Sequence, residues 1–67
     1  MSVAKIIEIS ARSSKSFEDA IGHGISKASK TVENIRSAWV KEMHAEVKDG
    51  EVTGYRVQMK VTFVLED

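Results

Sequence analysis

The sequence contains no cysteine and no proline. Without cysteine the chain forms neither disulfide bonds nor thiolate metal sites, and nothing in it indicates an oxidising compartment. The lack of proline, together with an even scatter of charged residues, argues against a linker or a low-complexity tail. We therefore predict one domain, over residues 1–67.

A net charge is also missing, because ten Lys and Arg residues balance ten Asp and Glu residues. A chain without a net positive field has no general attraction for nucleic acid or anionic lipid. The apolar run from Val3 to Ile9 is interrupted by Lys5 and Glu8, and no segment approaches the length that crosses a bilayer. We expect no nucleic-acid partner, no membrane association and a cytoplasmic location.

The small size of the chain limits the core that it can build. A fold of this length buries only about 60% of the surface that its unfolded form exposes. Domains below roughly 70–80 residues usually rely on disulfides, metals or association with other chains. Because cysteine is absent, self-association is the stabiliser that we expect.

The first half of the chain predicts a strand followed by a helix. β-branched residues indicate a strand over residues 3–10, and Ser13 or Ser14 can then cap a helix by accepting an N–H of its first turn. An apolar stripe at steps of three and four predicts a helix of about five turns. Gly22 and Gly24 inside it are either simply tolerated or, as we expect, explained by close approach of another backbone. The stripe consists of Phe17, Ala20, Ile21, Gly24, Ile25, Ala28, Val32 and Ile35.

The second half of the chain predicts one long hairpin. Asp49-Gly50 is typical of a two-residue turn, since both turn positions need positive φ and both residues accept it. A regular register then gives these cross-strand pairs: Lys48 with Glu51, Val47 with Val52, His44 with Tyr55, Val40 with Met59, and Trp39 with Lys60.

This register assigns the hairpin residues to two faces. Apolar residues at the odd positions from Tyr55 to Leu65, joined by Ala38 and Val40, are predicted to face the helix. The opposite, outer face receives Trp39, Lys41, Met43, Ala45 and Val47. One helix cannot cover both faces of a sheet, so we expect the outer face to contact another subunit, or a ligand held between subunits.

No catalytic arrangement is visible in the sequence. The serines lack a nucleophile-elbow setting, and the pair Gly22 and Gly24 lies inside the predicted helix, not at a phosphate-binding turn. His23 and His44 lack metal-ligand spacing. Glu42, His44 and Glu46 share a strand face, which we interpret as a polar wall, with a cation site as the alternative. We expect no enzyme activity, no catalytic residues and no metal ligands.

Several stretches together are typical of one protein family. They are residues 3–9 (VAKIIEI), the serine-capped helix, the Asp49-Gly50 turn and, most specifically, residues 57–67 (VQMKVTFVLED). Nearly the whole chain resembles the dodecins. The resemblance implies an α+β fold of β-α-β-β topology, in which a three-stranded antiparallel sheet wraps around one helix. It also implies a hollow homododecamer that stores or sequesters a small ligand without catalysis.

The resemblance further implies a flavin, FMN or riboflavin, as the ligand. In that family, a tryptophan at the start of the second strand stacks on the flavin, and a glutamine on the third strand binds its polar edge. Alignment without gaps from Thr31 places Ser37 and Arg56 at these two positions, while Trp39 and Gln58 lie two residues further along on the same faces. Ser37, Trp39, Arg56 and Gln58 are therefore the candidate ligand-binding residues.

Two alternatives stay open for this face. In one, the fold serves as a structural or ion-binding assembly without flavin, and Trp39 packs between subunits. In the other, the ligand is anionic, because the guanidinium of Arg56 donates in a fixed fork that suits phosphate or carboxylate. An ion pair from Arg56 to Glu42 or Glu46 of a neighbouring subunit is the less demanding explanation of the arginine.

Overall fold

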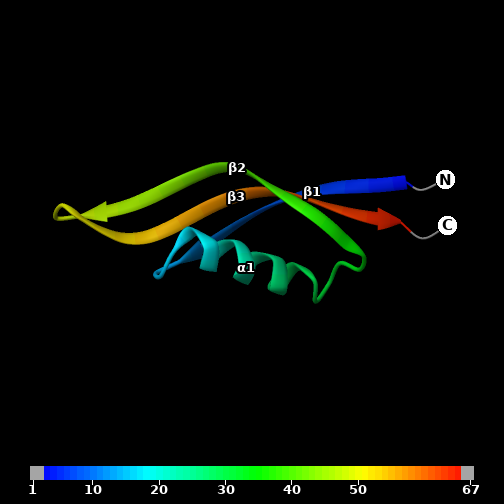
Figure 1. Ribbon diagram of the computed structural model, residues 1–67, viewed down its shortest axis with the longest axis horizontal. Helices are drawn as coiled ribbons and strands as arrows, with labels where there is room; N and C mark the ends of the chain where they lie inside the picture. The colour runs from blue at the N-terminus through cyan, green and yellow to red at the C-terminus, as the bar shows by residue number, and fades with distance from the viewer. Residues whose placement is uncertain (1–2, 66–67) are drawn as a thin grey trace.

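The computed structural model describes residues 3–65 and contains three strands and one helix (Figure 1). Their order is β1 (Val3–Ser13), α1 (Phe17–Ala28), β2 (Ile35–Lys48) and β3 (Glu51–Leu65). The strands form one antiparallel sheet in the order β1-β3-β2, so the last strand lies between the other two. The β-α-β-β fold class predicted from the sequence is confirmed.

The helix covers only the middle of one face of the sheet (Figure 1). The molecule is 52 Å long but only 19 by 13 Å in the other two directions. The turn end of the β2–β3 hairpin extends well past the start of α1, and we call residues 43–52 the arm. A helix of 12 residues is about 18 Å long, which is far shorter than the sheet.

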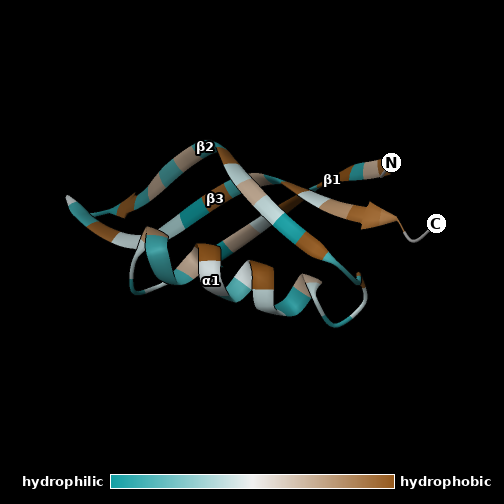
Figure 2. Cartoon of the chain, turned by 45° about the vertical axis from the view of Figure 1, so that its right-hand side comes forward, coloured by the Kyte–Doolittle hydropathy of each residue, from teal (hydrophilic) through white to brown (hydrophobic). Residues whose placement is uncertain are grey.

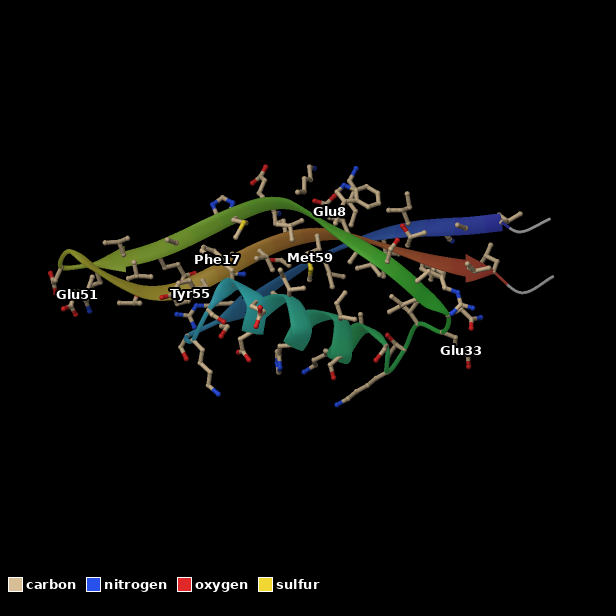
Figure 3. The ribbon with its side chains drawn as sticks, in the orientation of Figure 1. Glu8, Phe17, Glu33, Glu51, Tyr55 and Met59 are labelled. Carbon is tan, nitrogen blue, oxygen red and sulfur yellow. The ribbon has the colours of Figure 1, made fainter. Side chains whose placement is uncertain are left out.

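A small core lies between α1 and the sheet. Val57, Met59 and Val61 of β3 are fully buried, as the alternating pattern of that strand predicted. Figure 3 shows Met59 pointing from β3 toward α1, whose Ala20 is also fully buried. Partly buried side chains complete this core: Ile9, Phe17, Ile21, Ile25 and Val40.

Gly24 lies where the helix comes closest to the sheet. A Cβ at this position would lie 2.9 Å from Ala11 Cβ and 2.9 Å from Met59 Cε, whereas a Cβ at Gly22 would meet nothing within 4 Å. The expected close packing is therefore found at Gly24, which lies against Ala11 of β1, whereas Gly22 has open space among the described residues and is simply tolerated.

The start of the helix differs from the sequence prediction. Ser16 is the N-cap, and its Oγ accepts from the backbone N–H of Asp19 at 2.9 Å. Ser13 instead ends β1 and donates to Asp19 Oδ2 at 2.6 Å. The predicted capping by Ser13 or Ser14 is wrong because β1 continues for three residues beyond Ser10. It ends at Ser13, which pairs with Tyr55 of β3.

The end of the helix also differs, because α1 stops at Ala28 and does not continue to Ile35. Ser29 closes the last turn by donating its N–H to Ile25 O at 2.9 Å. Asn34 has φ 63°, which no α-helix includes and which asparagine tolerates better than most residues. Ile35 then enters β2 opposite Phe63, so pairing with β3 overrides the helical periodicity.

The hairpin turn is confirmed, with φ 53° at Asp49 and 79° at Gly50. The predicted register holds for Lys48 with Glu51, Val47 with Val52, Val40 with Met59 and Trp39 with Lys60. From Glu46 to Glu42 it is shifted by one residue. Two register irregularities cause the shift, since Thr53 of β3 and Lys41 of β2 each lack a direct partner. One extra residue on each strand restores the register.

The shift moves part of β2 to the other face of the sheet. Met43 lies opposite the buried Val57, and Ala45 lies opposite Tyr55, so both are on the helix side and not on the outer face as predicted. Val47 lies two residues further along β2, so it is on the helix side as well. His44 lies opposite Arg56 and not Tyr55.

Large apolar side chains remain exposed on this small fold. They are Val3, Ile6, Trp39, Met43, Val47, Val52 and Leu65. Figure 2 shows hydrophobic segments at both ends of the sheet, beyond the ends of α1. Among residues 3–65 there is no helix with the length and hydropathy needed to span a membrane.

Candidate functional site

The face of the sheet that points away from α1 contains all four candidate residues. Alternation with the buried residues of β3 places Arg56, Gln58, Lys60 and Thr62 on this outer face. Ser37 lies opposite Thr62, and Trp39 lies opposite Lys60. Glu8 of β1 pairs with Lys60 from the opposite edge of the sheet, and its side chain projects away from the helix (Figure 3).

Trp39 is the largest apolar group on the outer face. Trp39 is 46% exposed, and it lies on the edge strand β2 of the sheet. Ile6 of β1 is 52% exposed and shares this face, because it lies opposite Thr62. Ile6 was not among the residues predicted for this face, although alternation with Ile7 and Ile9, which point inward on the same strand, places it there.

Gln58 lies in the row next to Trp39. Its neighbours across the sheet are Ser10 on β1 and Glu42 on β2. Because the row of Lys60 and Trp39 is two residues away along β3, the two rows are about 7 Å apart. The structure therefore brings Trp39 and Gln58 to adjacent rows of one face but does not place them opposite each other.

Arg56 is engaged by side chains of its own chain. Its Nε lies 3.4 Å from Glu46 Oε2, and its Nη1 donates to Ser10 Oγ at 3.1 Å. Arg12 approaches the same carboxylate more closely, with 2.7 Å between its Nε and Glu46 Oε1. The ion pair that we considered between subunits thus forms within one chain.

The two arginines determine the electrostatics of this cluster. The hydrogen bond from Arg12 is the main cause that holds the pKa of Glu46 below its ordinary value, and Arg56 contributes in the same direction. Burial acts in the opposite direction and is outweighed. Glu46 is therefore a stable anion that neutralises part of the positive charge of Arg12 and Arg56.

The carboxylates near His44 do not form a metal site in one chain. Glu42 Oε1 lies 3.0 Å from His44 Nε2, while Glu46 is held by the arginines. Over residues 3–65, no cluster of three or more His, Asp or Glu side chains is arranged to hold a metal ion. Lys41 forms a separate ion pair with Glu8, at 3.5 Å.

Fold and face together define a small α+β domain with one helix-covered face and one open face that carries an exposed tryptophan among charged and polar groups. The model of the dodecin family matches residues 3–66. The chain belongs to the dodecin family.

Solved structures agree with this assignment. A point mutant of Thermus thermophilus dodecin is 30% identical over 100% of both chains, with a TM-score of 0.93. Dodecin from Streptomyces davaonensis is 30% identical over 98% of this chain and 97% of its own, with a TM-score of 0.92. A calcium dodecin from Mycobacterium tuberculosis, described as having a novel calcium-binding site, is 31% identical over 96% and 91%, with a TM-score of 0.81. No curated protein matches the chain significantly.

Proposed function

We propose that the chain assembles into a hollow homododecamer that binds and sequesters a flavin, riboflavin or FMN, between its subunits and catalyses no reaction. Membership of the dodecin family supports both the assembly and the class of ligand. The exposed apolar residues of this 67-residue chain support association independently, because surfaces of this kind usually meet a partner.

The exposure of Trp39 on the outer face is the observation that carries this proposal. A half-exposed indole on an open sheet offers a flat apolar surface to a flat aromatic ligand. Stacking a ring on an aromatic side chain contributes about 1–3 kcal/mol and needs no opposite charge. The second side of the ligand would then be covered by another subunit.

The other candidate residues have separate roles in this proposal. The amide of Gln58 both donates and accepts hydrogen bonds, which suits the polar edge of a flavin that reaches across the neighbouring row. Ser37 is small and leaves space beside Trp39. Arg56 is held by Glu46 and Ser10, so it borders the site and keeps N–H donors for a carbonyl or a phosphate.

Titration of riboflavin or FMN with the purified protein tests this function. We expect ligand fluorescence to be quenched at micromolar protein, and unchanged fluorescence would overturn the proposal. Trp39→Ala should weaken binding by about 1–3 kcal/mol, the contribution of one aromatic stacking partner. Trp39→Phe, which keeps a ring, should bind much more tightly than Trp39→Ala.

A dodecin-fold assembly without flavin is the second candidate function, with a structural or ion-binding role and Trp39 between subunits. Two observations favour it: the ion pair of Arg56 with Glu46 of the same chain, and the similarity to a calcium dodecin. In this case Trp39→Ala should lower the mass of the assembly, as measured by light scattering. The flavin-binding function predicts an unchanged mass with weakened ligand binding.

A further inference from the structure

The arm presents an uncovered apolar strip on the helix side of the sheet. Met43, Val47 and Val52 are 55%, 62% and 49% exposed, and Val47 lies directly opposite Val52. Phe17 packs edge-on against Tyr55, with ring centroids 5.0 Å apart, at the base of the arm. The helix begins at this point, so no helix or strand among residues 3–65 covers the strip further out.

The tip of the arm is acidic. Lys48, Asp49 and Glu51 together carry one net negative charge, and Glu51 projects from the end of the hairpin (Figure 3). Within residues 3–65, neither Asp49 nor Glu51 takes part in an ion pair.

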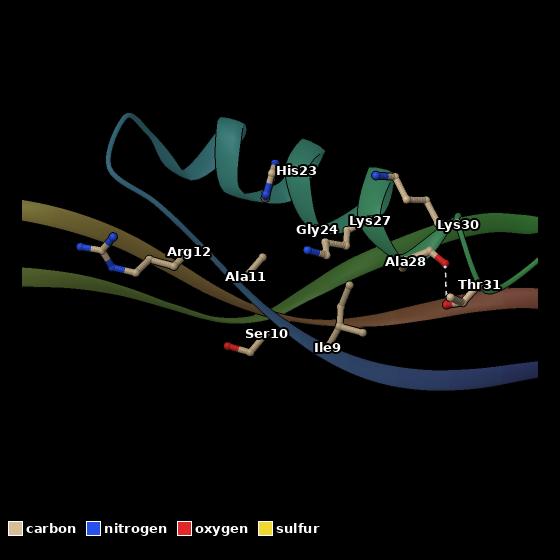
Figure 4. Close-up of a pocket in the computed structure, with 10 residues that line it drawn as sticks. All are labelled: Ile9, Ser10, Ala11, Arg12, His23, Gly24, Lys27, Ala28, Lys30 and Thr31. Atoms are coloured by element: carbon tan, nitrogen blue, oxygen red, sulfur yellow. Dashed lines mark hydrogen bonds between the residues drawn. The ribbon is translucent and has the colours of Figure 1, made fainter.

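A groove with the complementary character lies between α1 and β1. It has a volume of about 590 Å³ and a mostly apolar lining. Figure 4 shows Ile9 and Ala11 pointing from β1 toward the helix, where Gly24 and Ala28 complete the floor.

The rim of the groove is basic. Arg12, Lys27 and Lys30 line it together with His23, and no acidic residue belongs to the lining. Arg12 is neutralised by Glu46. Lys27 and Lys30 form no ion pair with any of the described residues, so they supply the free positive charge.

We propose that the arm of one copy docks in the α1–β1 groove of a second copy. Val47 and Val52 lie over the apolar floor in this contact, and Asp49 and Glu51 lie beside Lys27 and Lys30. Apolar burial supplies the affinity, and the unpaired charges on both sides determine orientation and exclude other partners. The proposal rests on the self-association proposed above and specifies one of its interfaces.

This contact must join different copies. The arm extends away from the helix, so it cannot fold back into its own groove. Because arm and groove are different parts of the surface, the contact is head-to-tail, and such contacts close into rings when the rotation between copies allows it. The outer face with Trp39 stays free, so ligand binding and this interface can be tested separately.

A charge exchange tests the proposal. Glu51→Lys reverses the tip without disturbing Asp49, which the turn requires at φ 53°, and Lys27→Glu with Lys30→Glu reverses the rim. Each reversal alone should raise the subunit concentration at half-assembly by about tenfold or more, because like charges then meet. The combined variant should assemble again at close to the wild-type concentration. Light scattering over a dilution series measures each assembly, and circular dichroism checks that each variant is folded.

Lys15→Glu is the matched control, since this exposed lysine is outside the groove, and it should leave assembly unchanged. If the wild type assembles and neither reversal changes its mass, this interface is overturned while the proposed shell stands. If the combined variant stays dissociated, the pairing of arm with groove is overturned. A wild type that is monomeric at every concentration overturns both the interface and the shell. Riboflavin titration of the same variants reports on the outer face independently.

Discussion

Arg12 and Glu46 connect the two edge strands across the central strand, with 2.7 Å between Arg12 Nε and Glu46 Oε1. The pair crosses β3 at Gly54. A Cβ at this position would overlap both the carboxylate of Glu46 and the guanidinium of Arg12. Because β3 has no side chain there, β1 and β2 contact each other directly above it.

The pH dependence of stability should report on this contact. The pKa of Glu46 in the folded state is below its ordinary value of 4.5, chiefly because of the hydrogen bond from Arg12. The unfolded chain therefore binds more protons, so the stabilisation is fully present above pH 4.5 and is lost as the pH falls through the folded-state pKa. Urea unfolding at fixed subunit concentration should show wild type losing stability relative to Glu46→Gln below pH 4.5. A constant difference at all pH values would contradict this.

Gly54→Ala should remove the same pH dependence by another route. The added methyl group displaces Glu46 from Arg12, and both side chains are flexible enough to move away without disrupting the strands. We expect the acid-dependent loss of stability to become smaller than in the wild type. An unchanged pH profile in this variant would show that the contact does not depend on Gly54.

The two helical glycines should respond in opposite directions to alanine. Gly24→Ala places a methyl group 2.9 Å from Ala11 Cβ, so it should destabilise the fold by about 1–3 kcal/mol through overpacking. Gly22→Ala meets nothing within 4 Å and should stabilise the helix by up to about 1 kcal/mol. Urea unfolding at one subunit concentration measures both. Equal effects of the two substitutions would disprove the close approach at Gly24.

The N-cap can be located by a pair of serine substitutions. Ser16→Ala removes the oxygen that accepts from the Asp19 N–H, so it should cost about 1 kcal/mol of stability. Ser14→Ala, two residues earlier, is the control and should change stability by less than about 0.5 kcal/mol, as surface substitutions usually do. A larger loss for Ser14→Ala would instead support the cap that the sequence first indicated.

Gln58→Ala should separate hydrogen bonding from stacking in the proposed flavin site. Loss of one or two neutral hydrogen bonds should weaken flavin binding by about 0.5–1.5 kcal/mol each, while Trp39 still stacks. Lys15→Ala, in the exposed segment before α1 and away from the outer face, is the control and should bind like the wild type. Fluorescence titration measures both variants. Equal affinities would remove Gln58 from the site.

Local chemistry in the sequence determined the order of the elements, the hairpin turn and the inward face of β3. Asp49 and Gly50 adopt the positive φ angles that their side chains permit, and alternation along β3 identified Val57 and Met59 as core. The similarity of nearly the whole chain to one family added the topology and the candidate residues.

Contacts between distant segments decided the rest. Lys41 and Thr53 lack direct cross-strand partners, and nothing in their immediate neighbours indicates this, so only the sheet places Met43 on the helix side. Pairing of Ile35 with Phe63 ended the helix earlier than its periodicity suggested. The ion pair between Arg56 and Glu46 forms only when β3 and β2 lie side by side in the hairpin. Sequence patterns thus determined which residues prefer the core. The residues of the outer face depend on the register of the assembled sheet, because a register shift of one residue moves every side chain of the shifted segment to the other face.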